Sequence, residues 1–133
     1  MAAKIPVIKF TKDNPKAYPP IKRHPDAAGY DLAVMAGVIL FPSRCREQCY
    51  ALGTGLCVDI PDGYYGTIHL RTTWASATNV RLVGSGIINP SYKGELILYV
   101  ENIGNHDQRI GAGQYIAEIV FHKIENVKVE VKD

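Results

Sequence analysis

The chain is divided into short apolar runs that are separated by turn residues. Glycine, proline and asparagine recur at positions such as Gly53, Pro61 and Gly104, and the runs between them are rich in Val, Ile, Tyr and Thr. Short runs of this composition, bounded by glycine or proline, are typical of β-strands. The pattern predicts strands at residues 38–41, 55–60, 65–70, 95–100, 115–122 and 127–131.

Helices are weakly supported by the same pattern. No stretch of twelve residues keeps apolar positions at helical spacing without an intervening glycine or proline. The best candidate, residues 43–52, is predicted to form one short helical turn at most. We therefore predict an all-β fold, either a β-sandwich, a jelly roll or a barrel.

Two of the predicted strands differ in the exposure that their patterns indicate. Residues 96–100 are almost continuously apolar, which is typical of a strand that is covered on both faces. In residues 127–131 the valines alternate with Lys128 and Glu130, which indicates a strand with one face in water. Charged side chains on that face also fit an edge strand that is protected against pairing with other chains.

Length and composition fit one folded domain. The 133 residues suffice for a single core, and the balance of 47% hydrophobic and 21% charged residues argues against wholesale disorder. We predict one domain over residues 1–133. Within it, residues 1–23 are expected to form an extended N-terminal arm, because residues 12–22 combine three prolines with several lysines.

Charge and hydropathy exclude two classes of partner. Fifteen Lys and Arg against thirteen Asp and Glu give a net charge of +2, too little for binding a phosphate backbone, so no nucleic-acid partner is expected. No apolar run approaches the roughly 18 residues of a membrane-spanning helix, and Met1 does not open a signal peptide. We expect an intracellular protein, in the cytoplasm or nucleus, without a membrane partner.

The three cysteines give no support for a disulfide framework or a metal centre. Cys45, Cys49 and Cys57 are odd in number and follow no secretion signal, which argues against disulfides. The spacing of Cys45 and Cys49 is tolerable for zinc, but no second ligand pair accompanies it. We interpret all three as buried or half-buried thiols and predict no metal ligands in the chain.

Three segments carry residues that suggest a binding or catalytic role. Residues 27–32 place Asp31 after a glycine bend, and residues 71–75 place Arg71 ahead of two threonines, a group that can grip phosphate. Glycines in residues 84–96 bracket a β-hairpin with room for a flat ligand, and Tyr92 offers an aromatic face. Each segment also fits a structural role, with Arg71 ending a strand, Trp74 in the core and Tyr92 packed in a plain hairpin.

These segments, together with residues 60–66 and 113–120, resemble the dUTPase family over about residues 24 to 125. The resemblance implies a jelly-roll or β-sandwich subunit, a homotrimer with active sites between subunits, and hydrolysis of dUTP to dUMP and pyrophosphate. It also implies magnesium on the substrate phosphates, a hairpin that reads uracil, and a tyrosine that stacks on the deoxyribose.

Several positions match the family's motifs. Asp31 matches the acidic residue of the first motif and Tyr92 the sugar-stacking tyrosine, while Arg71 and Thr72 match the phosphate-binding pair of the second motif. The implied substrate-binding residues are Arg71, Thr72, Gly84, Gly86, Ile88, Tyr92 and Glu118, and the implied catalytic positions are Asn89 and Asp31.

Other positions depart from the family pattern. Asn89 stands in place of the aspartate that activates water, and Ser91 in place of a frequent second aspartate. Gln114, Tyr115 and Glu118 occupy positions usually held by Asp, Arg and Gln, and the glycine-rich fifth motif is absent from the sequence. An amide cannot accept a proton near neutral pH, and losing a general base commonly costs about two to four orders of magnitude in rate.

These departures leave three hypotheses. The first is a dUTPase-fold protein with impaired or lost hydrolysis, which acts as an interaction or structural module for a protein partner and keeps a vestigial pocket; degenerate relatives of this kind suggest a viral source. The second is an active, divergent dUTP diphosphatase that uses Mg²⁺ and in which Asp31 orients the water. The third is an unrelated jelly roll, such as a lectin or capsid domain.

Overall fold

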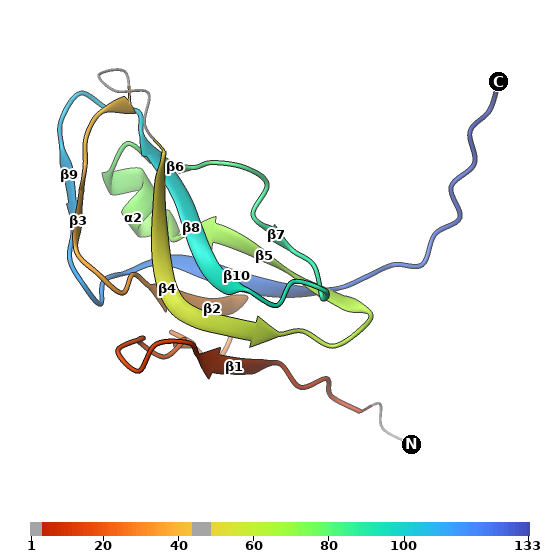
Figure 1. The fold of residues 1–133 in the computed structure, drawn as a ribbon. Coiled ribbons are helices and arrows are strands. Elements are labelled where there is room, and N and C mark those ends of the chain that lie inside the picture. The colour runs from red at the N-terminus through yellow and green to blue at the C-terminus, as the bar shows by residue number, and fades with distance from the viewer. Residues whose placement is uncertain (1–3, 44–48) are drawn as a thin grey trace.

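Antiparallel strands dominate the computed structural model, which describes residues 4–43 and 49–133 (Figure 1). Within these residues, two four-stranded sheets have the orders β1-β4-β8-β6 and β2-β10-β5-β7, and a two-stranded sheet joins β3 to β9. The all-β prediction is confirmed. The elements are β1 (Lys9–Lys12), β2 (Gly29–Ala33), β3 (Val38–Leu40), β4 (Tyr50–Asp59), β5 (Tyr64–Leu70), α2 (Thr72–Ala77), β6 (Val80–Leu82), β7 (Ile87–Ile88), β8 (Glu95–Asn102), β9 (Gln108–Ile110) and β10 (Tyr115–Lys123).

One apolar core joins the two larger sheets. Leu96, Leu98 and Val100 from β8 are almost fully buried, and Ile116 and Ile119 of β10 meet them from the other sheet. Burying each of these side chains contributes about 1.5–3 kcal/mol. The core therefore fixes the relative position of the two sheets, and with it the loops that run between them.

Strand β8 is not covered on both faces, so that expectation was wrong for the single chain. Its residues alternate between buried and accessible, and Tyr99 keeps 48% of its surface exposed. Ile97 and Tyr99 lie on the face of β8 that lines a cavity, described below. The continuous apolar run reflects two different surfaces, a core face and a cavity wall.

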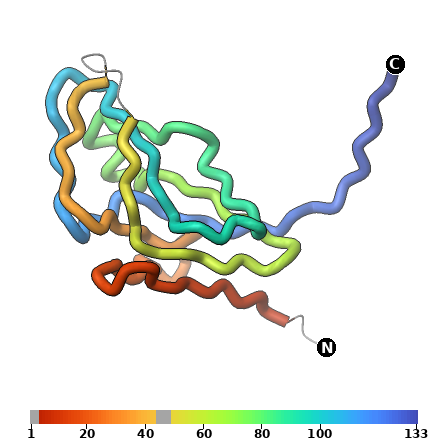
Figure 2. The backbone as a smooth tube through the Cα atoms, in the orientation of Figure 1, coloured from red at the N-terminus to blue at the C-terminus, as the bar shows by residue number. Residues whose placement is uncertain are grey.

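Residues 127–131 do not form the predicted strand. Val127, Val129 and Val131 are 76%, 81% and 91% exposed, and the segment runs away from the sheets in an extended path (Figures 1 and 2). A strand needs a hydrogen-bonded neighbour, and no described residue of the same chain supplies one. The alternating pattern therefore marks a segment without a partner in the single chain.

Several elements were missed by the pattern. They are β1, β2, β6, β7, β9 and the six-residue helix α2, most of which are short. Strand β4 begins at Tyr50, so the end of the predicted turn at residues 43–52 is a strand, and residues 44–48 lie outside the described residues. Within residues 1–23, Lys9–Lys12 pair with β4. No described helix is long and apolar enough to cross a membrane.

Candidate functional site

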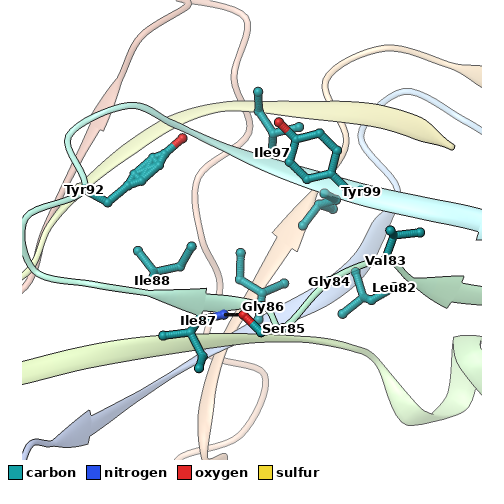
Figure 3. Close-up of a pocket in the computed structure, with 12 residues that line it drawn as sticks. Leu82, Val83, Gly84, Ser85, Gly86, Ile87, Ile88, Tyr92, Ile97 and Tyr99 are labelled. Atoms are coloured by element: carbon teal, nitrogen blue, oxygen red, sulfur yellow. Dashed lines mark hydrogen bonds between the residues drawn. The ribbon is translucent and has the colours of Figure 1, made fainter.

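A cavity of about 260 Å³ lies between β8 and the segment that leads from β6 through β7 (Figure 3). Most of its walls are aliphatic, and the polar groups are the Ser85 hydroxyl, two tyrosine hydroxyls and exposed backbone. The tyrosines, Tyr92 and Tyr99, lie on the side of the cavity opposite Ile87 and Ser85 in Figure 3. The lining residues are Ile68, Leu82, Val83, Gly84, Ser85, Gly86, Ile87, Ile88, Tyr92, Ile97, Leu98 and Tyr99.

Two glycines shape the floor of this cavity. Gly84 and Gly86 have φ angles of +90° and +73°, in the region that other residues rarely adopt. A Cβ at Gly86 would lie 2.6 Å from the carbonyl oxygen of Ile68, whose own N–H donates to the Gly86 carbonyl over 2.8 Å. The segment is thus pressed against β5. Strand β7 pairs with β5 and β8 belongs to the other sheet, so the two arms of the predicted hairpin at residues 84–96 do not pair with each other.

Tyr92 is held at the cavity by its polar end. Its hydroxyl donates to the Glu95 carbonyl over 2.5 Å, and its N–H donates to the Asn89 carbonyl over 3.0 Å. Burial raises the pKa of the Tyr92 phenol, and Tyr99, Cys57 and Glu95 raise the pKa further. The ring is therefore a fixed, uncharged surface at neutral pH.

Asn89 lies in the turn that follows β7. It is exposed, and it is not among the residues that line the cavity. Ser91, two residues later, is exposed as well. An amide in this place cannot take a proton from water, so the turn itself offers no general base.

A second group of predicted residues meets at the edge of the β2-β10-β5 sheet. Asp31 of β2 is 4% exposed, and its Oδ2 lies 2.9 Å from Nε of Arg23 and 3.5 Å from Nε of Arg71. Arg71 directly follows β5, so the pairing of β5 and β2 with β10 brings Arg71 close to Asp31. Arg23 comes from the predicted N-terminal arm and was not identified from the sequence.

Arg71 is anchored along its whole length. Its backbone N–H donates to the Ile116 carbonyl over 2.8 Å, and Nη1 donates to the Tyr115 carbonyl over 2.9 Å. The Tyr115 hydroxyl in turn donates to the Pro19 carbonyl over 2.7 Å. Burial first, then the charge of Asp31 and the nearby Tyr18, raises the pKa of Tyr115. Tyr115 therefore ties the N-terminal arm to this cluster and supplies no cation.

Glu118 occupies the centre of a row of titratable residues across the sheet. On β10 it stands directly opposite Asp31 of β2 and His69 of β5. Opposite residues of an antiparallel pair share a face, so two carboxylates are neighbours here. Thr72, at the start of α2, is exposed and lines a separate groove beside His69.

No metal centre is evident in the part of the chain that the structure describes. No group of three or more His, Cys, Asp or Glu side chains there is arranged to hold an ion. Cys49 is exposed and Cys57 is half-buried, and both are free thiols, while Cys45 lies outside the described residues. Burial raises the pKa of Cys57, as do Asp13 and Glu95.

Most of the predicted site residues fall into two groups, and Asn89 and Thr72 lie outside both. Gly84, Gly86, Ile88 and Tyr92 surround the cavity, and Asp31, Arg71 and Glu118 lie together across β2, β5 and β10. Three further residues were missed: Arg23, Ile97 and Tyr99. The only available signal for Arg23 was its basic neighbour Lys22, while Ile97 and Tyr99 were hidden in a run that was interpreted as core.

Comparisons with known proteins identify the family of the chain. A family model described as dUTPase matches residues 16–133. A deoxyuridine 5'-triphosphate nucleotidohydrolase of Syntrophotalea carbinolica is 33% identical over 125 residues, which cover 92% of this chain and 83% of the relative. Another, from fowl adenovirus A, is 32% identical and covers 90% of this chain, which spans 64% of the adenovirus protein.

A solved structure supports the same fold. A mutant dUTPase from phage phi11 of S. aureus superposes with a TM-score of 0.85 at 20% identity, covering 96% of this chain and 97% of the phage chain. An identity this low bears on the fold alone, whereas the match to the family model spans most of the chain. The chain therefore belongs to the dUTPase family.

Proposed function

We propose that the chain hydrolyses dUTP to dUMP and pyrophosphate as a divergent member of its family. The observation that carries the proposal is the cavity of about 260 Å³ beside a segment with two positive-φ glycines. Aliphatic walls, aromatic rings and exposed backbone edges suit a flat pyrimidine with its deoxyribose. Relatives named deoxyuridine 5'-triphosphate nucleotidohydrolase support the same substrate.

The nucleoside end is assigned to the cavity. Gly84, Gly86 and Ile88 would present backbone groups to the edge of the base. Tyr92, whose hydroxyl is bonded to the Glu95 carbonyl, would stack its ring on the sugar. An ordinary tyrosine has a pKa of about 10, and burial raises the pKa of Tyr92 further, so at neutral pH the stacking ring carries no charge that would repel the phosphates.

The phosphate end is assigned to Arg71 and Thr72. Asp31 and the Tyr115 carbonyl hold the Arg71 guanidinium in one orientation. Both guanidiniums approach the same carboxylate oxygen of Asp31, Oδ2, so the other oxygen would orient the attacking water. Asp31 and the neighbouring Glu118 are oxygen donors of the kind that magnesium accepts beside phosphates. Asp31 and Glu118 would face a magnesium ion bound to the substrate phosphates, and such an ion would supply charge neutralisation at the leaving pyrophosphate.

A second candidate function has an observation of its own. Asn89 replaces the expected water-activating residue, and Asp31 is engaged by Arg23 and Arg71. Both observations favour a protein that retains nucleotide binding and acts as an interaction module for a protein partner. The two candidates share the cavity and differ only in turnover.

We also propose a homotrimer. Val127, Val129 and Val131 alternate with charged residues in an extended segment that lacks a neighbouring strand among the described residues. A partner subunit would supply that neighbour and cover exposed apolar residues such as Ile87. Sedimentation at micromolar concentration is expected to give three chains per particle, and a monomer under these conditions would refute the assembly.

Pyrophosphate release from dUTP, measured with magnesium at high protein concentration, tests the proposed hydrolysis. We expect slow turnover by the natural chain and loss of that turnover in Tyr92→Ala, which excludes a contaminating enzyme. Asn89→Asp restores a general base and is expected to raise the rate by about 100-fold. If neither the natural chain nor Asn89→Asp releases pyrophosphate while dUMP still binds, the interaction module is the correct candidate.

A further inference from the structure

The nucleoside cavity opens at a fork between the two large sheets. Val83, which follows β6, donates its N–H to the Tyr99 carbonyl of β8 over 2.8 Å. The chain then crosses to the other sheet, where the Gly86 carbonyl accepts from the Ile68 N–H over 2.8 Å. Among the described residues, no strand pairs with residues 95–98 of β8 on this side. The gap between that stretch and the crossing segment is the cavity.

A flat ligand in this gap has one face toward the core and the other toward solvent. Neighbouring side chains of a strand point to opposite faces of its sheet. Leu98 of β8 is 1% exposed and belongs to the core, as does Ile68, and both line the cavity. Tyr99 is 48% exposed and lies on the opposite face of β8. Aliphatic side chains therefore cover the inner face of such a ligand, and Tyr99 offers a ring to its outer face.

Tyr99 and Tyr92 are separate aromatic surfaces of the cavity. Figure 3 shows their hydroxyl ends turned toward each other, and burial first, then the nearby Tyr99, raises the pKa of Tyr92. The Tyr92 hydroxyl is bonded to the Glu95 carbonyl, whereas the Tyr99 hydroxyl has no hydrogen-bond partner among the described residues. The backbone of Tyr99 is fixed at the fork while its side chain can settle on a ligand.

We propose that Tyr99 stacks on the pyrimidine base and covers the face of the base that the core does not reach. The inference rests on the proposed function, because a nucleoside must occupy the cavity, and it assigns base recognition to one further residue. A base that is held only at its edge, by backbone groups of Gly84 and Gly86, leaves its outer face in water. A phenol ring on that face buries apolar surface and adds the contact of two stacked π-systems. Tyr92 then contacts the sugar and Tyr99 the base.

The test compares two ligands that differ only in the flatness of the base. Deoxyuridine has a planar ring, and dihydrodeoxyuridine, in which the ring double bond is reduced, has a puckered one with the same carbonyls, N–H group and sugar. Calorimetry measures both affinities. We expect Tyr99→Ala to weaken deoxyuridine about tenfold and dihydrodeoxyuridine less than about twofold, because stacking needs a flat base. Tyr99→Phe keeps the ring and should bind both ligands within about twofold of the natural chain.

A non-hydrolysable imido analogue of dUTP extends the test to the nucleotide. Tyr99→Ala should weaken this analogue by the same factor as deoxyuridine, because the phosphates do not contact the ring. Tyr30→Ala is the matched control, since Tyr30 is 37% exposed and lies on β2, at the opposite edge of its sheet from β7. It should change none of the affinities, and urea unfolding shows whether each variant is folded.

Three outcomes would overturn the inference. They are an unchanged affinity of Tyr99→Ala for deoxyuridine, an equal loss for dihydrodeoxyuridine, and a loss in Tyr99→Phe as large as in Tyr99→Ala, which would assign the contact to the hydroxyl.

Pyrophosphate release separates this inference from the proposed function. If the natural chain binds deoxyuridine but releases no pyrophosphate from dUTP, hydrolysis fails, and the preference for a flat base still tests Tyr99. If Tyr99→Ala releases pyrophosphate as fast as the natural chain at limiting dUTP, the proposed function stands and the stacking role of Tyr99 fails.

Discussion

The nucleoside cavity and the Asp31 cluster are stabilised by different interactions. The cavity owes its shape to backbone geometry, with Gly86 pressed against β5 and Tyr92 fixed by the Glu95 carbonyl. The Asp31 cluster consists of charges that compensate one another, with two guanidiniums on one carboxylate. A cavity shaped by backbone leaves N–H and C=O groups available to a ligand. In the Asp31 cluster the charges are paired with one another, so less charge is available to a ligand.

This difference bears on how each region responds to sequence change. Replacing a side chain beyond the cavity floor leaves the backbone shape intact, so the cavity can persist when residues of the following turn, such as Asn89, differ. In the Asp31 cluster each group depends on its partner, because an unpaired buried charge is costly. The cavity is therefore the region where ligand recognition is expected to survive, and the cluster is the region that limits chemistry.

The largest effect is expected when the cavity floor is displaced. Gly86→Ala combines an unfavourable φ of +73° with a Cβ 2.6 Å from the Ile68 carbonyl oxygen. We expect a loss of about 4 kcal/mol in the free energy of unfolding, from backbone strain and overpacking together. Urea unfolding measures this loss, and dUMP titration should show that binding is abolished.

Gly84→Ala is the matched control for the steric contact between a Cβ at position 86 and the Ile68 carbonyl oxygen. Gly84 has a φ of +90°, but a Cβ there meets nothing within 4 Å. Strain alone is expected to cost about 1–2 kcal/mol. If Gly84→Ala and Gly86→Ala destabilise the protein equally, the close approach of Gly86 to β5 does not shape the cavity.

The next effect concerns the charge cluster. Asp31→Asn leaves Arg71, whose side chain is 20% exposed, without its carboxylate partner. We expect unfolding free energy to fall by about 3 kcal/mol, the cost of breaking a largely buried pair. Thermal or urea unfolding at neutral pH measures it.

Asp59→Asn provides the comparison for Asp31→Asn. Asp59 forms its ion pair with Lys93 where both side chains are about two-thirds exposed, 66% and 65%. Exposed pairs contribute roughly 0–1 kcal/mol, so this variant should unfold almost as the natural chain does. Equal losses in the two variants would show that burial does not distinguish the two pairs.

The fold was predictable where one strand carries its own signal. Strands β5 and β10 were placed nearly to their ends because their Val, Ile and Tyr runs face a core. Strands such as β2 and the two-residue β7 contain no such run. They are strands because they pair with neighbouring strands, so their own composition did not predict them. The valines at 127–131 show the converse, a strand pattern without a partner in the chain.

The candidate site was predictable only as far as local motifs reach. Asp31, Arg71 and Tyr92 were found from short segments that resemble a family. The Arg23 contact depends on the antiparallel bridge between Ile21 and Asp31, which holds the N-terminal segment beside β2. Tyr99 was hidden because an apolar run does not reveal which of its faces lines a cavity. Contacts made by the tertiary fold leave no such local signature.

A smaller effect is expected from removing the ring at the cavity rim. Tyr92→Ala deletes the surface that the sugar or base would contact, and stacking on an aromatic ring contributes about 1–3 kcal/mol. We expect dUMP and the triphosphate analogue to bind about tenfold more weakly, by the same factor, because the phosphates do not contact this ring. A loss confined to the triphosphate would place the ring at the phosphate end instead.

The smallest effect is a difference in alkaline stability. The pKa of Tyr92 is raised in the folded chain, chiefly by burial, above the value of about 10 for an unfolded tyrosine. Below pH 10 both states hold the proton, so the contribution to stability is fully present. As the pH rises from 10 through the folded pKa, the unfolded chain loses its proton first and stability falls.

Tyr92→Phe has no such proton, so its unfolding free energy, measured by urea titration from pH 9 to 11, should decline less steeply than that of the natural chain. Tyr115→Phe should flatten the curve in the same direction, since burial and Asp31 raise the pKa of Tyr115. Parallel curves for the natural chain and both variants would show that neither phenol is held neutral by the fold.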